Sequence, residues 1–285
     1  MIRMENVNFV YTPGSPFETA ALENVNLHIE KGLFYGLIGH TGSGKSTLVQ
    51  LMSGLVKPTA GSIFVDGIDT SNKKFKLSDI KGKVGLVFQY PEHQLFEETV
   101  IADVSFGPKN LGLSEAEVLY RAKSALEVVG IGEELFNVSP FELSGGQKRR
   151  VAIAGVLAME PDVLILDEPT AGLDPAGRDD ILANIVKLHE KKKNTVILVS
   201  HNMEDIAATA DKIIVMNDSR VAMHGTIKEV FSRSRELSEI GLAIPEISKV
   251  ILKLREKGIN IRNDIYTPAE AAEEIIKILG GGHRE

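Results

Sequence analysis

The chain has 285 residues, of which 43% are hydrophobic and 25% are charged, a composition typical of a folded globular protein with a sizeable core. Its 32 basic and 39 acidic residues give a formal net charge of −7, which argues against broad electrostatic binding of nucleic acid. Cysteine is absent, no apolar run is long enough to cross a bilayer, and no signal-peptide core follows Met1, so we expect a soluble intracellular protein without disulfides or thiolate chemistry.

Short apolar runs alternate with amphipathic helical patterns along the chain, which is typical of an α/β protein with a largely parallel sheet. The clearest strands are predicted at residues 33–38, 84–88, 163–166, 195–199 and 212–216. Near residues 25–29 and 63–65, apolar and polar side chains alternate instead, which indicates antiparallel strands covered on one face. We therefore expect an antiparallel β subdomain beside a doubly wound core with a mixed sheet.

Two helical regions accompany this core. Residues 97–160 show helical patterns between two predicted strands, so we predict a helical subdomain inserted into the α/β core. After residue 225 the strand signals stop, and helices beginning near Pro245 and Pro268 predict a small helical extension. The predicted organisation is thus a domain at residues 1–225 and an extension at 226–285.

Residues 39–47 form a glycine-rich segment, GHTGSGKST, between a predicted strand and a predicted helix. The segment matches the pattern G-x-x-x-x-G-K-[ST], in which glycines let main-chain N–H groups point at phosphate oxygens beside a helix N-terminus. We expect Lys45 to reach the β- and γ-phosphates and the Ser46 hydroxyl to coordinate Mg²⁺. An ordinary glycine-rich turn is the alternative, which the flanking strand and helix disfavour. The predicted nucleotide-binding residues of this loop are Gly39, His40, Thr41, Gly42, Ser43, Gly44, Lys45, Ser46 and Thr47.

The strand predicted at residues 163–166 ends in two carboxylates, Asp167 and Glu168. We expect this strand to lie beside the phosphate-loop strand and to present Asp167 to the Mg²⁺ shell. Glu168 would then face the γ-phosphate, where its carboxylate could polarise an attacking water. A pair of solvated acids at a strand end is the alternative.

The segment LSGGQ at residues 143–147 offers a second anion site, because two glycines lie at a helix N-terminus capped by Ser144. Together with the phosphate loop and the acidic strand, this motif resembles the ATP-binding cassette (ABC) ATPases, which have a P-loop NTPase fold. The resemblance covers about residues 1–225. It implies that two chains enclose two ATP molecules head to tail, each signature binding the γ-phosphate held by the partner. The alternative is that Ser144 only caps its helix. The implied signature and dimer-site residues are Ser144, Gly145, Gly146, Gln147 and Asp174.

The same resemblance implies the remaining site residues. Gln89 matches a glutamine that contacts Mg²⁺ and water, and His201 matches a histidine that hydrogen-bonds the γ-phosphate. An ordinary surface histidine is the alternative for His201. The implied ligands are ATP and Mg²⁺, the implied metal-binding residues are Ser46, Gln89 and Asp167, and the implied catalytic residues are Glu168, His201 and Gln89. Since no motif is missing, the resemblance predicts an active ATPase.

An aromatic residue near the N-terminus is expected to stack on adenine. Tyr11 matches the position of that residue in the family. Phe9 is the competing position, although the alternation of a strand places it on the same face as Val7, which is expected to be a core residue.

Residues 89–108 and 147–155 resemble the ATPases of energy-coupling factor importers, which take up vitamins or transition metals. This resemblance implies an ATP-hydrolysing subunit that pairs with a similar ATPase, often as a heterodimer. The pair would sit at the cytoplasmic face of the cell membrane on an integral scaffold subunit, with a substrate-binding membrane subunit. The ATPase of another importer class and a non-hydrolysing regulatory nucleotide-binding module are the alternatives.

Two surfaces follow from the importer resemblance. Leu95 and Phe96 are expected to form a groove for the scaffold, the alternative being a buried turn. The extension at 226–285 is expected to dimerise, because its apolar face is broad for so small a unit. A helical cap without a partner is the alternative for the extension. The residues of this apolar face are Ile244, Ile247, Val250, Ile251 and Leu254.

Overall fold

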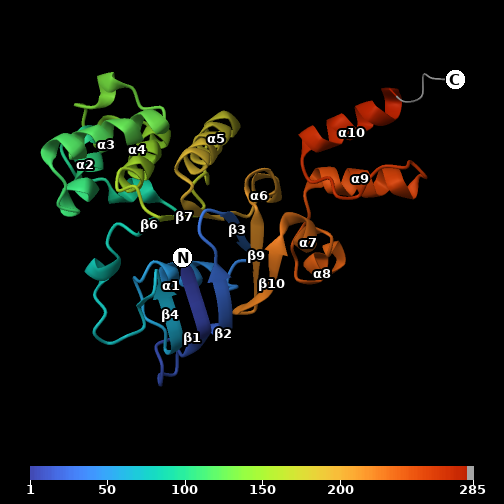
Figure 1. Cartoon of the computed structure of the whole chain (residues 1–285), viewed down its shortest axis with the longest axis horizontal. Coiled ribbons are helices and arrows are strands. Elements are labelled where there is room, and N and C mark those ends of the chain that lie inside the picture. Colours follow the sequence, from blue (N-terminus) through green and yellow to red (C-terminus); the bar gives the residue numbers. More distant parts are fainter. Residues whose placement is uncertain (281–285) are drawn as a thin grey trace.

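The computed structural model, which describes residues 1–280, contains two β-sheets, of which the antiparallel one lies at the lower end of the molecule in Figure 1. The four-stranded antiparallel sheet has the order β2-β1-β4-β5, with β1 (Ile2–Tyr11), β2 (Thr19–Ile29), β4 (Ala60–Val65) and β5 (Ile68–Asp69). The six-stranded sheet has the order β10-β9-β3-β8-β7-β6, with β3 (Phe34–Gly39), β6 (Val84–Val87), β7 (Val163–Asp167), β8 (Thr195–Val199), β9 (Lys212–Asn217) and β10 (Arg220–Thr226). Only β10 is antiparallel to its neighbour in this sheet. The predicted α/β fold with an antiparallel β subdomain is confirmed.

The order of the central strands differs from the prediction in one respect. The acidic strand β7 does not lie beside the phosphate-loop strand β3, because β8 is inserted between them. Leu37 of β3 is in register with Val199 of β8, which is in register with Asp167 of β7. The three parallel strands therefore end at one edge of the sheet, and the residues that follow them still meet there.

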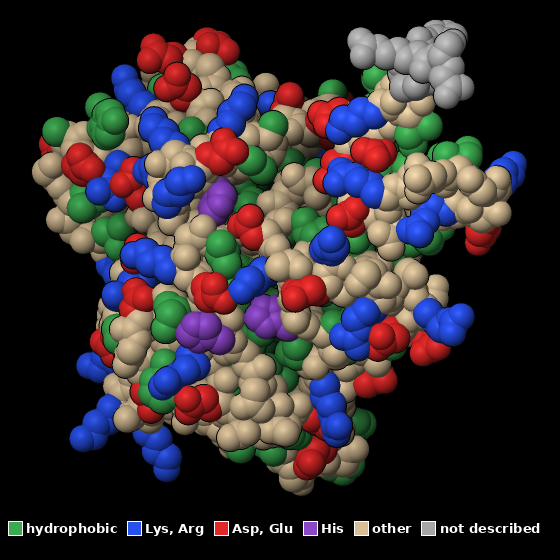
Figure 2. Space-filling model, turned by 45° about the vertical axis from the view of Figure 1, so that its right-hand side comes forward, with side chains coloured by type: hydrophobic (Ala, Val, Ile, Leu, Met, Phe, Trp, Pro, Cys, Tyr) green, Lys and Arg blue, Asp and Glu red, His purple; other side chains and the backbone are tan. Residues whose placement is uncertain are grey.

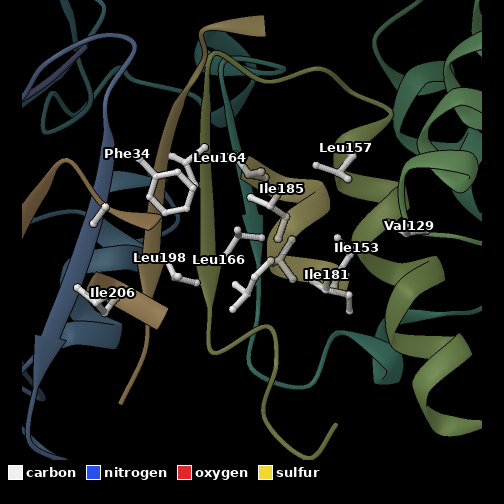
Figure 3. Close-up of a cluster of buried hydrophobic side chains, with 14 of the residues drawn as sticks. Phe34, Val129, Ile153, Leu157, Leu164, Leu166, Ile181, Ile185, Leu198 and Ile206 are labelled. Atoms are coloured by element: carbon white, nitrogen blue, oxygen red, sulfur yellow. The ribbon is translucent and has the colours of Figure 1, made fainter. Parts of the chain in front are cut away.

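The parallel strands are apolar on both faces because each face is covered. Phe34 and Ile38 of β3 belong to one buried cluster, whereas Tyr35 and Leu37 belong to the other. The first cluster lies under α4 (Gly145–Leu157) and α5 (Pro175–Lys192), and Figure 3 shows their isoleucine and leucine side chains directed at the strands. The second cluster includes the buried side chains of α1 (Lys45–Met52), which packs between the two sheets.

Three helices, α2 (Val100–Asn110), α3 (Glu115–Val128) and α4, pack against one another on one side of the molecule (Figure 1). They lie within the predicted helical region at 97–160, in which 3₁₀ turns at Glu133–Leu135 and Pro140–Glu142 lead into α4. Ser144 caps α4, and the side chains of Ser144 and Gln147 form a reciprocal capping box as expected.

The C-terminal residues form short helices on the other side of Figure 1, namely α7 (Ile227–Phe231), α8 (Ser234–Glu239), α9 (Glu246–Glu256) and α10 (Pro268–Gly280). The first two helices pack on the main core, whereas α9 and α10 share a small cluster around Ile251 and Ile265. The N–H of Glu246, at the start of α9, donates 3.1 Å to Glu204 Oε1 in α6 (Met203–Thr209). No helix within residues 1–280 is both long and apolar enough to cross a membrane.

Candidate nucleotide-binding site

A pocket of about 410 Å³ lies at the edge where β3, β7 and β8 end. Most of the residues predicted to bind nucleotide and metal line it: Tyr11, Thr41, Gly42, Gly44, Lys45, Ser46, Thr47, Gln89, Asp167, Glu168 and His201. Gly39, His40 and Ser43 belong to the same loop but do not line the pocket. The tertiary structure thus brings together residues from segments that are far apart in the chain.

The phosphate loop has the local geometry that its glycines predict. Gly44 precedes α1 with a φ of +101°, and a Cβ at this position would lie 2.5 Å from the main-chain oxygen of Ala21. Only glycine fits such a position, which combines a left-handed backbone with a close approach of another chain segment. The loop therefore delivers the N-terminus of α1, with its free N–H groups, into the pocket.

Lys45 and Asp167 place poorly compensated charges in this pocket. Lys45 is 7% exposed, and its Nζ donates to the main-chain oxygens of Gly39 at 2.6 Å and His40 at 2.9 Å. Burial lowers the pKa of Lys45, although Glu168 and Asp167 oppose that shift. Burial also raises the pKa of Asp167, helped by Glu168 and opposed by Lys45. Phosphate groups beside Lys45 and a cation beside Asp167 would relieve both costs.

Glu168 is the carboxylate that the surrounding side chains orient. His201 Nε2 lies 2.7 Å from Glu168 Oε1, and Gln89 Nε2 donates to Glu168 Oε2 at 3.2 Å. The backbone of Glu168 has a φ of +50°, which is uncommon for a residue with a side chain and costs about 1–3 kcal/mol. Such strain is characteristic of functional positions, and here it accompanies a carboxylate held between two polar groups from other segments.

Tyr11 lies at the wall of the pocket, at the end of β1. The residue is 43% exposed, and its hydroxyl is 3.0 Å from Thr47 Oγ1. Phe9 instead packs against the buried cluster between the sheets and contacts the Tyr11 ring edge-on, with 4.9 Å between the centroids. Of the two aromatic residues, Tyr11 is therefore the one available to a ligand.

The signature segment lies in a different pocket of about 400 Å³. Ser144, Gly146, Gln147 and Asp174 line this second pocket, whereas Gly145 does not. The two pockets share no lining residue. Asp174 also caps α5, since its carboxylate accepts from the N–H of Gly177 at 3.3 Å. The four signature positions and Asp174 therefore do not complete the first pocket of the same chain.

The segment after Gln89 presents an exposed aromatic pair. Leu95 is buried, but Phe96 is 56% exposed and meets Phe106 of α2 edge-on, with 4.9 Å between the ring centroids. Both phenylalanines line a pocket of about 360 Å³ beside α4. The alternative of a wholly buried turn is wrong for Phe96.

Part of the pocket wall comes from residues that were not predicted from the sequence. Thr19, Ala20 and Ala21 of β2 also line the first pocket, and the main-chain oxygen of Ala21 lies close to Gly44 of the loop. These small residues carry no chemical signature, and only the pairing of β2 with β1 places them there.

Acidic and basic side chains are interspersed on the face of the described residues shown in Figure 2.

Comparison with known proteins relates this arrangement to a family. The profile of the family described as ABC transporter matches residues 22–171. The chain is 59% identical to the Energy-coupling factor transporter ATP-binding protein EcfA2 of Clostridium acetobutylicum, with 99% of each protein covered. It is 56% identical to the protein of the same name from Clostridium perfringens, with 98% of each covered.

Solved structures show the same similarity. One is a dimeric post-hydrolysis state of the ATP-binding cassette MJ0796 bound to ADP and Pi, with a TM-score of 0.72 and 33% identity over 80% of this chain and 99% of that one. Another is cbiO1 from Clostridium perfringens, described as part of the ABC transporter complex cbiONQ. Its TM-score is 0.73 and its identity 39%, over 88% of this chain and 98% of that one.

Proposed function

The chain belongs to the ABC transporter family of ATPases, and on that premise we propose that it is the ATP-hydrolysing subunit of an energy-coupling factor importer for a vitamin or transition metal. The observation that carries the proposal is the pocket in which the phosphate loop faces Glu168, held between Gln89 and His201. Near full-length similarity to energy-coupling factor ATP-binding proteins supports this class of transporter.

In this proposal each residue of the pocket has a distinct role. Lys45 and the N–H groups of the loop bind the β- and γ-phosphates. Glu168 orients or deprotonates the attacking water, and the contacts of its two oxygens with Gln89 and His201 fix the direction in which the carboxylate faces. His201 stabilises the charge that develops on the γ-phosphate, and Gln89 holds the water and the carboxylate in place.

The oxygen donors of the pocket suit Mg²⁺. A hydroxyl from Ser46, a carboxylate from Asp167 and an amide oxygen from Gln89 line the same space. Hydroxyl, carboxylate and amide oxygens are ligands that Mg²⁺ accepts together with substrate phosphates. The ion, when bound, neutralises phosphate charge.

We propose that the signature pocket serves a second ATPase subunit. Its residues lie at the N-termini of α4 and α5, and the glycine-rich start of α4 is the part that attracts phosphate. These residues do not line the nucleotide pocket of their own chain. A head-to-tail dimer places each signature against the other chain's γ-phosphate. The energy-coupling factor resemblance favours a homologous partner, and thus a heterodimer.

The docking of the subunit at the cytoplasmic face of the membrane is also part of the proposal. The exposed Phe96 and Phe106, which line one pocket beside α4, provide an apolar groove for an integral membrane scaffold subunit. Of the predicted apolar face, Ile244 and Ile251 are buried within the chain, because Ile244 packs on the main core and Ile251 fills the cluster between α9 and α10. Dimerisation of the extension would therefore use the apolar residues that α9 and α10 leave exposed, which include Val250, Ile276 and Leu279.

Purification of the full-length tagged chain from membranes of its source tests the assignment. We expect a second ATPase, an integral scaffold and a small substrate-binding membrane protein to co-purify, and the complex to hydrolyse ATP. Co-purification with a permease that works with an external binding protein would instead indicate another importer class. A complete complex that binds ATP without hydrolysing it would indicate a regulatory module.

Stacking on adenine predicts a selective effect at Tyr11. Replacing Tyr11 with Ala should weaken ATP binding about tenfold, because base–aromatic stacking contributes about 1–3 kcal/mol. Tyr11→Trp should restore the affinity, measured by titration with a fluorescent ATP analogue. As a control, Phe9→Leu should lower the melting temperature without changing the affinity. A larger loss of affinity in Phe9→Leu than in Tyr11→Ala would assign the stacking role to Phe9.

A further inference from the structure

Arg149 is a nearly buried cation one turn into α4, just after the signature segment. Its side chain is 4% exposed. Nε and Nη2 donate to the two carboxylate oxygens of Glu92, each at 3.1 Å. Nη2 also donates to the main-chain oxygen of Gln89 at 3.0 Å. One guanidinium therefore ties the signature helix to the segment that follows β6 at two points.

Stability alone does not account for this arrangement. Taking a guanidinium and a carboxylate out of water costs free energy, and an apolar pair of similar volume often stabilises a fold as well or better. Arg149 Nη1 is buried and has no hydrogen-bond partner among residues 1–280, which adds to that cost. The planar, forked guanidinium instead provides directional contacts that neither lysine nor an apolar residue reproduces.

The contact to Gln89 leads directly to the candidate catalytic carboxylate. Arg149 Nη2 donates a hydrogen bond to the main-chain oxygen of Gln89. The side-chain Nε2 of Gln89 in turn donates a hydrogen bond of 3.2 Å to Glu168 Oε2. The Gln89 side chain is itself exposed at the pocket wall. The neighbouring ring of Tyr90 lies 5.8 Å from the Arg149 guanidinium carbon, within cation–π range. The backbone of this segment is thus held from the side of α4.

We propose that Arg149 is a positioning residue for ATP hydrolysis, which acts by holding the Gln89 backbone so that the Gln89 side chain reaches Glu168. The inference rests on the proposed function, in which Gln89 and Glu168 act on the nucleotide. A residue of this kind affects the chemical step more than nucleotide binding, since it does not line the nucleotide pocket.

A double-mutant cycle in the assembled, purified transporter complex tests the route through Gln89. Arg149→Lys should lower kcat about tenfold and change KM for ATP by less than about twofold. In a Gln89→Ala background, Arg149→Lys should change kcat by less than about twofold, because the side chain that it positions is gone. An unchanged kcat in Arg149→Lys, or an equal loss with and without the Gln89 side chain, would overturn the inference.

Two further variants distinguish a positioning role of Arg149 from a nonspecific effect of losing an ion pair on the fold. Glu92→Gln keeps the Arg149 contact to the Gln89 carbonyl, so its loss of kcat should be smaller than that of Arg149→Lys. Arg121→Lys is the matched control, since Arg121 pairs with Glu117 at 2.6 Å and with Glu160 at 3.4 Å away from the pocket. Its kcat should stay within about twofold of wild type. A larger loss in either variant than in Arg149→Lys would contradict a specific role for Arg149.

The test remains decisive if Arg149→Lys does not fold. The pair Arg149→Met with Glu92→Leu replaces the buried ions by apolar side chains, which preserves packing without an unpaired charge. This folded double variant should show the same loss of kcat, and wild-type kcat would overturn the inference. Hydrolysis by the wild-type complex and its loss in Glu168→Gln support the proposed function separately, so a silent Arg149 variant counts only against the positioning role.

Discussion

Replacing Glu168 with Gln should lower kcat for ATP hydrolysis by about 1,000-fold in the assembled complex while leaving ATP binding intact. General-base assistance contributes about 10²–10⁴-fold to such reactions, and an amide cannot accept the proton of the attacking water. Glutamine nevertheless has nearly the same shape and can keep one hydrogen bond to Gln89 or His201. The loss should therefore appear in kcat, measured by phosphate release, rather than in the dissociation constant for ATP.

The other end of the same strand provides the control for Glu168. Asp162 immediately precedes β7 and is exposed, so Asp162→Asn removes a carboxylate next to the opposite end of the strand and outside the pocket. Its kcat should equal that of wild type. Hydrolysis by Glu168→Gln at the wild-type rate within the transporter would show that Glu168 is not the catalytic carboxylate.

Replacing Lys45 with Met should weaken ATP binding about 100-fold. A hydrogen bond to a charged group contributes about 1.5–3 kcal/mol, and each 1.4 kcal/mol corresponds to a tenfold change in affinity. Because burial lowers the pKa of Lys45, its cation is held at a cost to folding. An apolar chain of similar length should therefore leave the melting temperature of the nucleotide-free protein within about 5 °C of wild type.

The loss of ATP binding in Lys45→Met can be measured directly from the stabilisation that ATP gives to the folded protein. Saturating ATP should raise the melting temperature of the wild-type protein, whereas the same concentration should produce a much smaller rise in Lys45→Met. Lys187→Met, an exposed change on α5, should behave as wild type. An equal ATP-induced rise in wild type and Lys45→Met would refute the assignment of Lys45 to the phosphates.

Local sequence was sufficient to predict those features of the site and fold that depend on residues close together in the chain. The glycines and Lys45 of the phosphate loop, the capping box of Ser144 and Gln147, and the Asp174 cap each involve residues within a few positions of one another. The alternation of buried side chains also predicts the antiparallel strands, because a strand that is covered on one face has a period of two. These features are set by backbone sterics and by nearby hydrogen bonds, which short segments encode.

Contacts between segments that are far apart in the chain could not be predicted from the sequence in this way. The position of β8 between β3 and β7, the wall formed by Ala20 and Ala21, and the Arg149–Glu92 pair depend on segments that meet only in the folded chain. In the motif QKRRVAIAG, Arg149 is one of two adjacent arginines, and nothing in the spacing distinguishes its buried position from that of Arg150.

The groups expected to act on the nucleotide can be read from short contiguous segments, because the phosphate loop, the acidic strand and the signature each consist of a few neighbouring residues. How these segments combine follows from the folded chain. It places Glu168 between Gln89 and His201, separates the signature from the nucleotide pocket of its own chain, and exposes Phe96 while burying Arg149. These placements depend on the whole core, because distant segments contribute together to the free energy that burial and strand order minimise.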